Sequence, residues 1–205
     1  MGGGAPAGTG GPEALSRALA EVDYLADRPL AVALFLAVEL ERPLLVEGPA
    51  GTGKTELARA ASQALGRSLV RLQCYEGLDE SRALYEWDYP KQILYTQLLR
   101  ARLDAATEGA ADDAQAMARV STVAQSFFSR QFLLARPLLS AIESDVPALL
   151  LIDEVDRSDP EFEALLLELL AERQITIPEL GTIRAKHAPL VVLTANGTRE
   201  MSEAL

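Results

Sequence analysis

Eight consecutive residues have the types and spacing of a phosphate-binding loop. Residues 48–55 read GPAGTGKT, which matches the pattern G-x-x-x-x-G-K-[ST]. Glycines let the backbone curl so that its N–H groups face a phosphate, while Lys54 supplies a cation for the β- and γ-phosphates and Thr55 a hydroxyl for Mg²⁺. The sequence therefore predicts that Mg·ATP is bound here. The predicted nucleotide-binding residues are Gly48, Pro49, Ala50, Gly51, Thr52, Gly53, Lys54, Thr55 and Glu56.

Two adjacent carboxylates follow an apolar run later in the chain. Residues 149–152 read LLLI and precede Asp153 and Glu154. A strand that ends in a carboxylate places Asp153 at the sheet edge where a phosphate loop also lies, so we expect it to hold Mg²⁺ through the metal's water shell. Glu154 is placed to orient and deprotonate the attacking water, which favours hydrolysis over transfer to another acceptor. The alternative is that these acids only cap the next helix.

A third polar residue, Asn196, follows the apolar run 189–194 (PLVVLT). The same edge geometry directs its amide at the γ-phosphate or at the attacking water. The alternative is an ordinary turn residue, since asparagine is common in turns. The predicted catalytic residues are thus Lys54, Glu154 and Asn196, and the predicted metal-binding residues are Thr55 and Asp153.

These residues need strands and helices in a fixed order to bring them together. Apolar runs and helical spacing predict alternating helices and strands, which is typical of an α/β doubly wound parallel sheet of the P-loop NTPase type. Helices are expected at 13–22, 29–40, 54–65 and 160–173. Strands are expected at 43–47, 68–74, 148–152 and 189–194, and a β-hairpin at 175–184. The segment 91–144 is expected to be largely helical, with a break at 107–114.

Length and composition limit what the chain can be. Its 205 residues suit one domain, with a Gly- and Pro-rich flexible tail at 1–12 and a nucleotide-binding core at 13–205. The net charge of −11 gives no broad support for nucleic-acid or anionic-membrane binding. The apolar stretch 30–40 is too short to span a bilayer. Cys74 is the single cysteine, so no internal disulfide can form, which is consistent with a protein of the reducing cytoplasm. We expect Cys74 to be a buried strand residue rather than a nucleophile.

With the loop, the acid pair and Asn196 in this order, the chain resembles an AAA+ ATPase. Four segments, 69–80, 83–89, 177–183 and 198–205, are similar to the CoxD-like subgroup of the MoxR branch. The resemblance implies ATP-driven remodelling by a hexameric ring with a von Willebrand factor A domain partner. For CoxD-like members it also implies a client metalloenzyme, through maturation of the copper–molybdenum site of carbon monoxide dehydrogenase.

The resemblance also bears on what the chain contains. Family members continue into an arginine finger and a helical lid, and this chain ends at Leu205, so a core incomplete at its C-terminus and without the lid is expected. We therefore expect mainly monomer and slow hydrolysis. Related ATPases place pore-facing loops after the second strand, where Tyr85, Trp87 and Tyr89 alternate; hydrophobic packing is the alternative for these aromatic residues.

The same residues also allow other interpretations of the protein's function. A nucleotide-gated binding or scaffold module with little turnover would bind ATP in the same way, and a P-loop phosphotransferase would share Lys54 and Thr55, although Glu154 disfavours it. A GTPase is disfavoured because neither N-K-x-D nor D-x-x-G occurs in the chain. Arg157 and the segment 198–200 either serve a neighbouring subunit's site or are surface residues.

Overall fold

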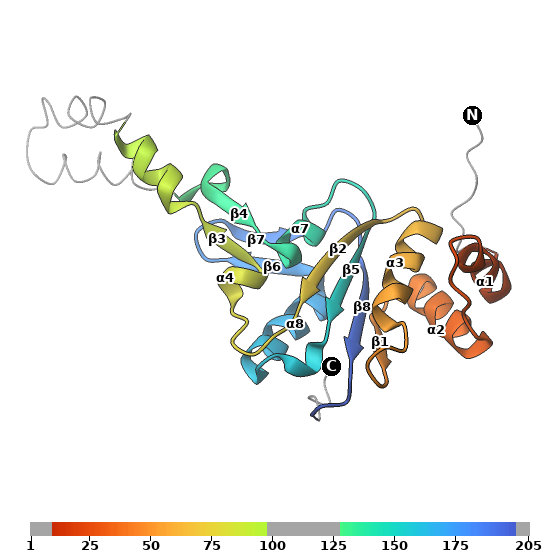
Figure 1. Ribbon diagram of the computed structural model, residues 1–205. Helices are drawn as coiled ribbons and strands as arrows, with labels where there is room; N and C mark the ends of the chain where they lie inside the picture. Colours follow the sequence, from red (N-terminus) through yellow and green to blue (C-terminus); the bar gives the residue numbers. More distant parts are fainter. Residues whose placement is uncertain (1–9, 98–127, 200–205) are drawn as a thin grey trace, which may run out of the picture.

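The computed structural model describes residues 10–97 and 128–199 and is built around a four-stranded parallel sheet (Figure 1). The strand order is β1-β8-β5-β2. One strand, β8, therefore separates the strand before the glycine-rich loop from the strand before the acid pair. The strands are β1 (Leu44–Glu47), β2 (Ser68–Gln73), β5 (Ala148–Asp153) and β8 (Leu190–Ala195).

The two central strands, β5 and β8, are apolar along almost their whole length because they are covered on both faces. Every residue of each strand is buried. Successive side chains point to opposite faces of a sheet. Accordingly Leu149 and Leu151 belong to one core, and Leu150 and Ile152 belong to the other. A continuous apolar run is the expected pattern for a strand of this kind.

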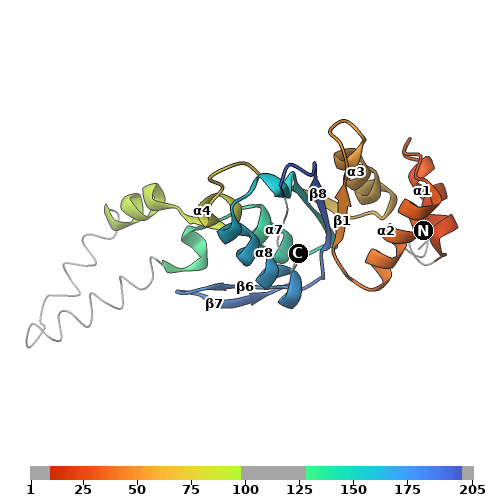
Figure 2. The ribbon, with the colours of Figure 1, turned by 90° about the horizontal axis from the view of Figure 1, so that it is seen from below.

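Three helices cover the first face (Figures 1 and 2): α1 (Pro12–Ala20), α2 (Arg28–Glu39) and α3 (Lys54–Ala64). The buried residues Leu15, Leu34 and Leu57, one from each helix, share a core with the sheet. The side chain of Asp27 caps α2 by accepting a hydrogen bond from the N–H of Leu30 at 2.9 Å. This satisfies one of the free donors that begin every helix.

The second face is covered by α7 (Pro137–Ile142), α8 (Pro160–Glu172) and the predicted hairpin. The hairpin strands, β6 (Gln174–Ile177) and β7 (Gly181–Arg184), pair antiparallel, and Ile175 and Ile177 enter the core. A short 3-10 helix, η3 (Val155–Arg157), connects β5 to the segment before α8. The sheet is thus wound on both sides, as the sequence predicts.

The expectation of a largely helical 91–144 is wrong in part. Residues 89–97 are helical, but η2 (Arg130–Phe132) leads into a strand, β4 (Leu133–Ala135), which pairs antiparallel with β3 (Tyr85–Trp87). A four-residue helix, α4 (Glu80–Ala83), precedes β3. This pairing joins segments about 50 residues apart, so local helical spacing does not show it. The predicted break at 107–114 lies outside the described residues.

The aromatic side chains of this region divide between core and surface. Trp87 is buried and meets Tyr85 and Phe128 edge to face, with ring centroids 6.1 and 5.3 Å away. Tyr89 is 57% exposed. Packing therefore accounts for Trp87, while Tyr89 lies on the surface. No helix in the described part of the chain combines the length and the apolar character needed to cross a membrane.

Candidate nucleotide-binding site

The four parallel strands end at one edge of the sheet, and the predicted site residues follow those ends. In the strand register, Gln73 of β2 lies opposite Asp153 of β5, and Glu47 of β1 lies opposite Ala195 of β8. The N–H of Gly48 donates to the carbonyl of Ala195 at 3.2 Å. The loop, the acid pair and Asn196 therefore start from adjacent positions. Ligands of open parallel sheets bind at this edge.

The loop leaves β1 and enters α3 through two glycines in left-handed conformations. Gly51 has φ 82° and Gly53 has φ 86°, and no atom lies within 4 Å of a Cβ built on either. These positions need glycine for backbone conformation rather than for lack of space. Gly53 is the N-cap of α3, and no side chain caps this helix. Its first N–H groups are therefore available to an anion, and the helix dipole favours negative charge there.

Lys54 is buried at the first turn of α3, with 8% of its surface exposed. Its ammonium donates to the carbonyl of Gly48 at 2.6 Å and to that of Pro49 at 2.7 Å. These bonds hold the cation against the backbone of the loop. They also satisfy a charge that would otherwise be costly to bury.

Thr55 and Asp153 lie together, as a shared role in holding Mg²⁺ requires. The hydroxyl of Thr55 donates to the Asp153 carboxylate at 3.0 Å. Asp153 is only 3% exposed. A hydroxyl and one carboxylate are oxygen ligands, and Mg²⁺ takes few protein ligands beside water and phosphate oxygens. The donor set therefore fits Mg²⁺.

Two further residues bind the Asp153 carboxylate. Thr194, buried on β8, donates its hydroxyl at 2.6 Å, and Arg71 of β2 donates from its guanidinium at 2.6 Å. Arg71 keeps half of its side chain exposed. A buried carboxylate is costly unless it is paired and hydrogen-bonded, and these contacts provide both.

Glu154 has a left-handed backbone, with φ 56°, which is uncommon for a residue with a side chain. Its N–H donates to the Thr194 hydroxyl at 2.9 Å. Its carboxylate accepts from Gln73 at 3.1 Å and from Arg157 at 2.9 Å. Non-glycine residues in this conformation persist where surrounding contacts fix them, and they cluster at functional sites. The chain thus fixes both the backbone and the carboxylate of Glu154.

Asn196 follows β8 beside the start of the loop, and a buried carboxylate holds its backbone. The N–H groups of Asn196 and Thr198 donate to Oδ2 of Asp156 at 3.1 and 2.9 Å, and the Thr198 hydroxyl donates to the same atom at 2.6 Å. Burial alone would raise the pKa of Asp156, but the bonds from Thr198 and Asn196 together lower it. Asp156 therefore connects the segment after Glu154 to the end of β8.

Sequence reasoning missed four residues at this edge: Arg71, Gln73, Asp156 and Thr194. One signal was available, because Arg71 and Gln73 are polar residues two apart in a predicted strand, so they share a face. Their partners on β5 depend on β2 lying next to β5. The local spacing of residues does not reveal the order of the strands in the sheet.

The arginines considered for a neighbouring subunit's site make contacts within their own chain. Arg157 binds Glu154 of its own chain. The guanidinium of Arg199 binds the Glu163 carboxylate and the carbonyls of Asp156 and Ser158. Cys74 is fully buried just after β2. Residues 200–205 lie outside the described residues.

The parallel sheet, the glycine-rich loop before α3 and the acid pair at the end of β5 define an α/β P-loop NTPase core. Residues 43–205 match the model of the AAA domain family, dynein-related subfamily, so the chain belongs to that family. Its fold is that of an AAA+ core.

A solved structure from Cytophaga hutchinsonii, described as a "putative ATPase", is similar in fold, with a TM-score of 0.54 at 16% sequence identity. The match covers 92% of this chain and 44% of that one, so the chain spans less than half of that protein's length. No curated protein matches significantly.

Proposed function

We propose that this core binds Mg·ATP at the C-terminal edge of its sheet and hydrolyses it. The observation that supports this most directly is the contact between Thr55 and Asp153, at 3.0 Å, beside the loop that holds Lys54. Residues about 100 positions apart in the sequence meet only because the fold brings β1 and β5 to the same edge. Their types are those that Mg²⁺ and a triphosphate require.

Each residue then has a role that its position supports. The uncapped start of α3 and the ammonium of Lys54 bind phosphate oxygens. Thr55 and Asp153 hold Mg²⁺, which neutralises charge on the phosphates. Glu154 orients water and takes its proton, while Gln73 and Arg157 fix its carboxylate. Asn196 directs its amide at the γ-phosphate or the water.

Replacing Asp153 by Asn tests the proposed metal site. The amide keeps the shape of the side chain but removes its charge, so the gain in ATP affinity that Mg²⁺ provides is expected to shrink by about tenfold, from the loss of one charged contact. Calorimetric titrations with ATP, in Mg²⁺ and in a chelator, measure this gain directly. Asp145→Asn, at an exposed carboxylate away from the sheet edge, is the control. An equal Mg²⁺ effect in both variants would exclude Asp153 as a metal residue.

We further propose that the protein is a MoxR-type ATPase of the CoxD-like subgroup, active in the cytoplasm. On this proposal a ring of subunits works with a von Willebrand factor A domain partner and remodels a metalloenzyme such as carbon monoxide dehydrogenase. The support is the similarity of segments 69–80, 83–89 and 177–183, together with the hairpin β6–β7, which matches the predicted range 175–184 to within one residue. The test is the copper content of the client enzyme in cells carrying wild-type or Lys54→Ala protein. Equal copper content would argue against this client.

A nucleotide-gated binding module is the second candidate. The observation that favours it is that one oxygen of the Glu154 carboxylate, Oε2, accepts from both Gln73 and the cation of Arg157, so this oxygen is occupied by contacts within the chain. Binding without turnover would follow if these contacts persisted with nucleotide bound. Phosphate release measured at saturating Mg·ATP separates the two candidates.

A further inference from the structure

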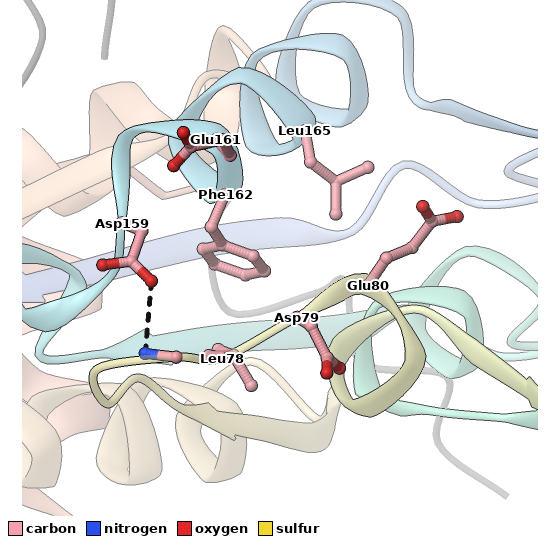
Figure 3. A pocket seen from close by; sticks show the side chains of 8 residues that line it. Leu78, Asp79, Glu80, Asp159, Glu161, Phe162 and Leu165 are labelled. Carbon is pink, nitrogen blue, oxygen red and sulfur yellow. Dashed lines mark hydrogen bonds between the residues drawn. The ribbon is translucent and has the colours of Figure 1, made fainter.

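A groove runs between α8 and the segment that leads from β2 into α4. It consists of two cavities of about 350 and 280 Å³ that share Glu80 and Leu165 in their walls. Figure 3 shows the first cavity, with Phe162 and Leu165 of α8 on one side and residues 78–80 on the other. None of the loop residues that we assign to nucleotide binding lines either cavity. The groove is therefore a separate surface of the molecule.

The floor of the groove is apolar. Leu78 is 4% exposed and Phe162 is 3% exposed, so both are anchored in the core beneath the groove. Leu165, one turn further along α8, is only partly buried and lies in the walls of both cavities. An apolar side chain of a partner entering the groove would bury this surface, which is favourable.

The rim carries carboxylates in the walls of both cavities, and most of them line the first. Four carboxylates line the first cavity and a fifth is added in the second, while no Lys, Arg or His lines either one. The five residues are Asp79, Glu80, Asp159, Glu161 and Glu168. On α8 the acids Glu161 and Glu168 are seven residues apart with Leu165 between them, so the three share one helical face.

The charge of this rim has no ion-pair partner in the described part of the chain, and Arg82 acts on Asp79 only by longer-range attraction. Among residues 10–97 and 128–199, no ion pair involves any of the five acids. Asp159 accepts from the N–H of Gly77 at 3.2 Å (Figure 3), and Asp79 caps α4. These bonds fix the carboxylates in place but leave their negative charge. A cleft lined by one sign of charge concentrates the opposite charge.

We propose that this groove binds a short peptide segment of a partner protein, in which an apolar side chain is flanked by Lys or Arg. The apolar residue occupies the floor at Phe162 and Leu165, and the flanking cations face Glu80 and Glu161. The charge of the rim selects this chemistry over a neutral or acidic segment. Binding of this kind requires no nucleotide, so it can be tested separately from ATP binding.

The test uses two fluorescent peptides, KRLLKR and EELLEE, whose binding to the full chain is followed by anisotropy without nucleotide. The basic peptide is expected to bind at least tenfold more tightly, and to weaken as salt rises from 50 to 300 mM. Glu80→Gln with Glu161→Gln is expected to weaken it about tenfold. The double variant Glu21→Gln with Glu39→Gln removes the same charge from exposed positions of the other face and is expected to change little.

A second variant, Leu165→Ala, tests the apolar floor. It is expected to weaken binding of the basic peptide without allowing the acidic peptide to bind. No binding of KRLLKR, equal binding of both peptides, or equal loss in the two double variants would overturn the proposal. The other possible occupant of the groove is a second copy of the chain, and sedimentation of the free chain measures whether it self-associates. If the chain self-associates and Glu80→Gln with Glu161→Gln abolishes this, the groove binds a second copy and the proposal is wrong.

Discussion

At the residue scale, the Asp153 carboxylate accepts hydrogen bonds from three side chains. Thr55, Thr194 and Arg71 all bind it; Thr194 is buried, whereas Thr55 and Arg71 are exposed. A buried carboxylate without partners would destabilise the strand end. The contacts therefore hold the Asp153 carboxylate at the sheet edge. The Thr55 hydroxyl is held in the same place.

Glu154→Gln is the residue-level prediction for catalysis. The amide can still hydrogen-bond water but cannot take its proton, so ATP binding is expected to persist while phosphate release falls about 10²- to 10⁴-fold. Calorimetry and a phosphate-release assay measure the two effects. Glu172→Gln, at the exposed end of α8, serves as the matched control. Equal turnover in Glu154→Gln and wild type would assign the base to another group.

A second residue-level prediction concerns Cys74. Burial, and then the charges of Asp153, Asp156 and Glu154, raise the pKa of its thiol to about 12. The thiolate is the reactive form, so at pH 8 the folded protein is expected to react with a thiol reagent on the order of 10³-fold more slowly than the unfolded chain.

The raised pKa of Cys74 also predicts how the stability of the folded protein changes with pH. Above about pH 9 the unfolded chain loses the thiol proton and the folded protein does not, so this group lowers the free energy of unfolding as pH rises toward 12. Because Cys74 is the only cysteine, the labelling signal has one source. Rapid labelling of folded protein with a midpoint near pH 8.5 would contradict the buried environment.

At the element scale, Asp156 joins η3 to the turn after β8. Asp156→Ala leaves three donors from Asn196 and Thr198 without an acceptor and is expected to lower the free energy of unfolding by about 2–4 kcal/mol. Asp156→Asn keeps an acceptor oxygen and is expected to cost about 1 kcal/mol. Urea unfolding at pH 7 measures both. A loss below 0.5 kcal/mol in Asp156→Ala would show that the two elements are held by other contacts.

The same residue predicts a pH dependence. The pKa of Asp156 is lowered in the folded protein, so its contribution to stability is present above about pH 4 and is lost as pH falls through the folded value. The difference in unfolding free energy between wild type and Asp156→Asn is therefore expected to shrink from pH 5 toward pH 2. A constant difference would assign the lowered pKa to another group.

Element positions could largely be predicted from the sequence because three strands of the central sheet, β1, β5 and β8, are local apolar runs. The segments 148–152 and 189–194 differ by a residue at most from the ends of β5 and β8. The glycine-rich loop could also be predicted, since its residues are contiguous in the sequence. The fold class is confirmed for the same reason. Alternating helices and strands leave few arrangements other than a doubly wound sheet.

The contacts that Arg71 and Thr194 make with Asp153 could not be predicted, because they depend on which strands are neighbours in the sheet. Arg71 meets Asp153 across 82 residues, and Thr194 meets it across 41. Each contact depends on the strand order β1-β8-β5-β2, which is a property of the whole sheet. The pairing of β3 with β4 was missed on the same grounds, since 85–87 and 133–135 carry no local signal for each other.

At the scale of the whole molecule, the proposed site touches elements from both cores. The loop leads into α3, which packs with Leu149 and Leu151 on one face of the sheet. The segment after Asp153 contributes Val155 to the core on the other face. A ligand at this edge therefore contacts segments whose separation would require both cores to open. Its binding free energy is expected to add to the stability of the whole fold.

Thermal unfolding of the whole chain tests this coupling. Mg·ATP at 100 times its Kd is expected to stabilise the folded state by about 2.7 kcal/mol, because it binds the folded chain alone. For a chain of 205 residues this corresponds to a rise in Tm of about 5–11 °C. Lys54→Ala removes the cation at the loop and is expected to abolish most of the rise, whereas Lys186→Ala, at an exposed ion pair, is expected to keep it. AMP, which lacks the β- and γ-phosphates, is expected to give little shift, and a chelator is expected to reduce the shift with ATP. An equal rise in Lys54→Ala and wild type would place the nucleotide elsewhere and remove the loop from the site.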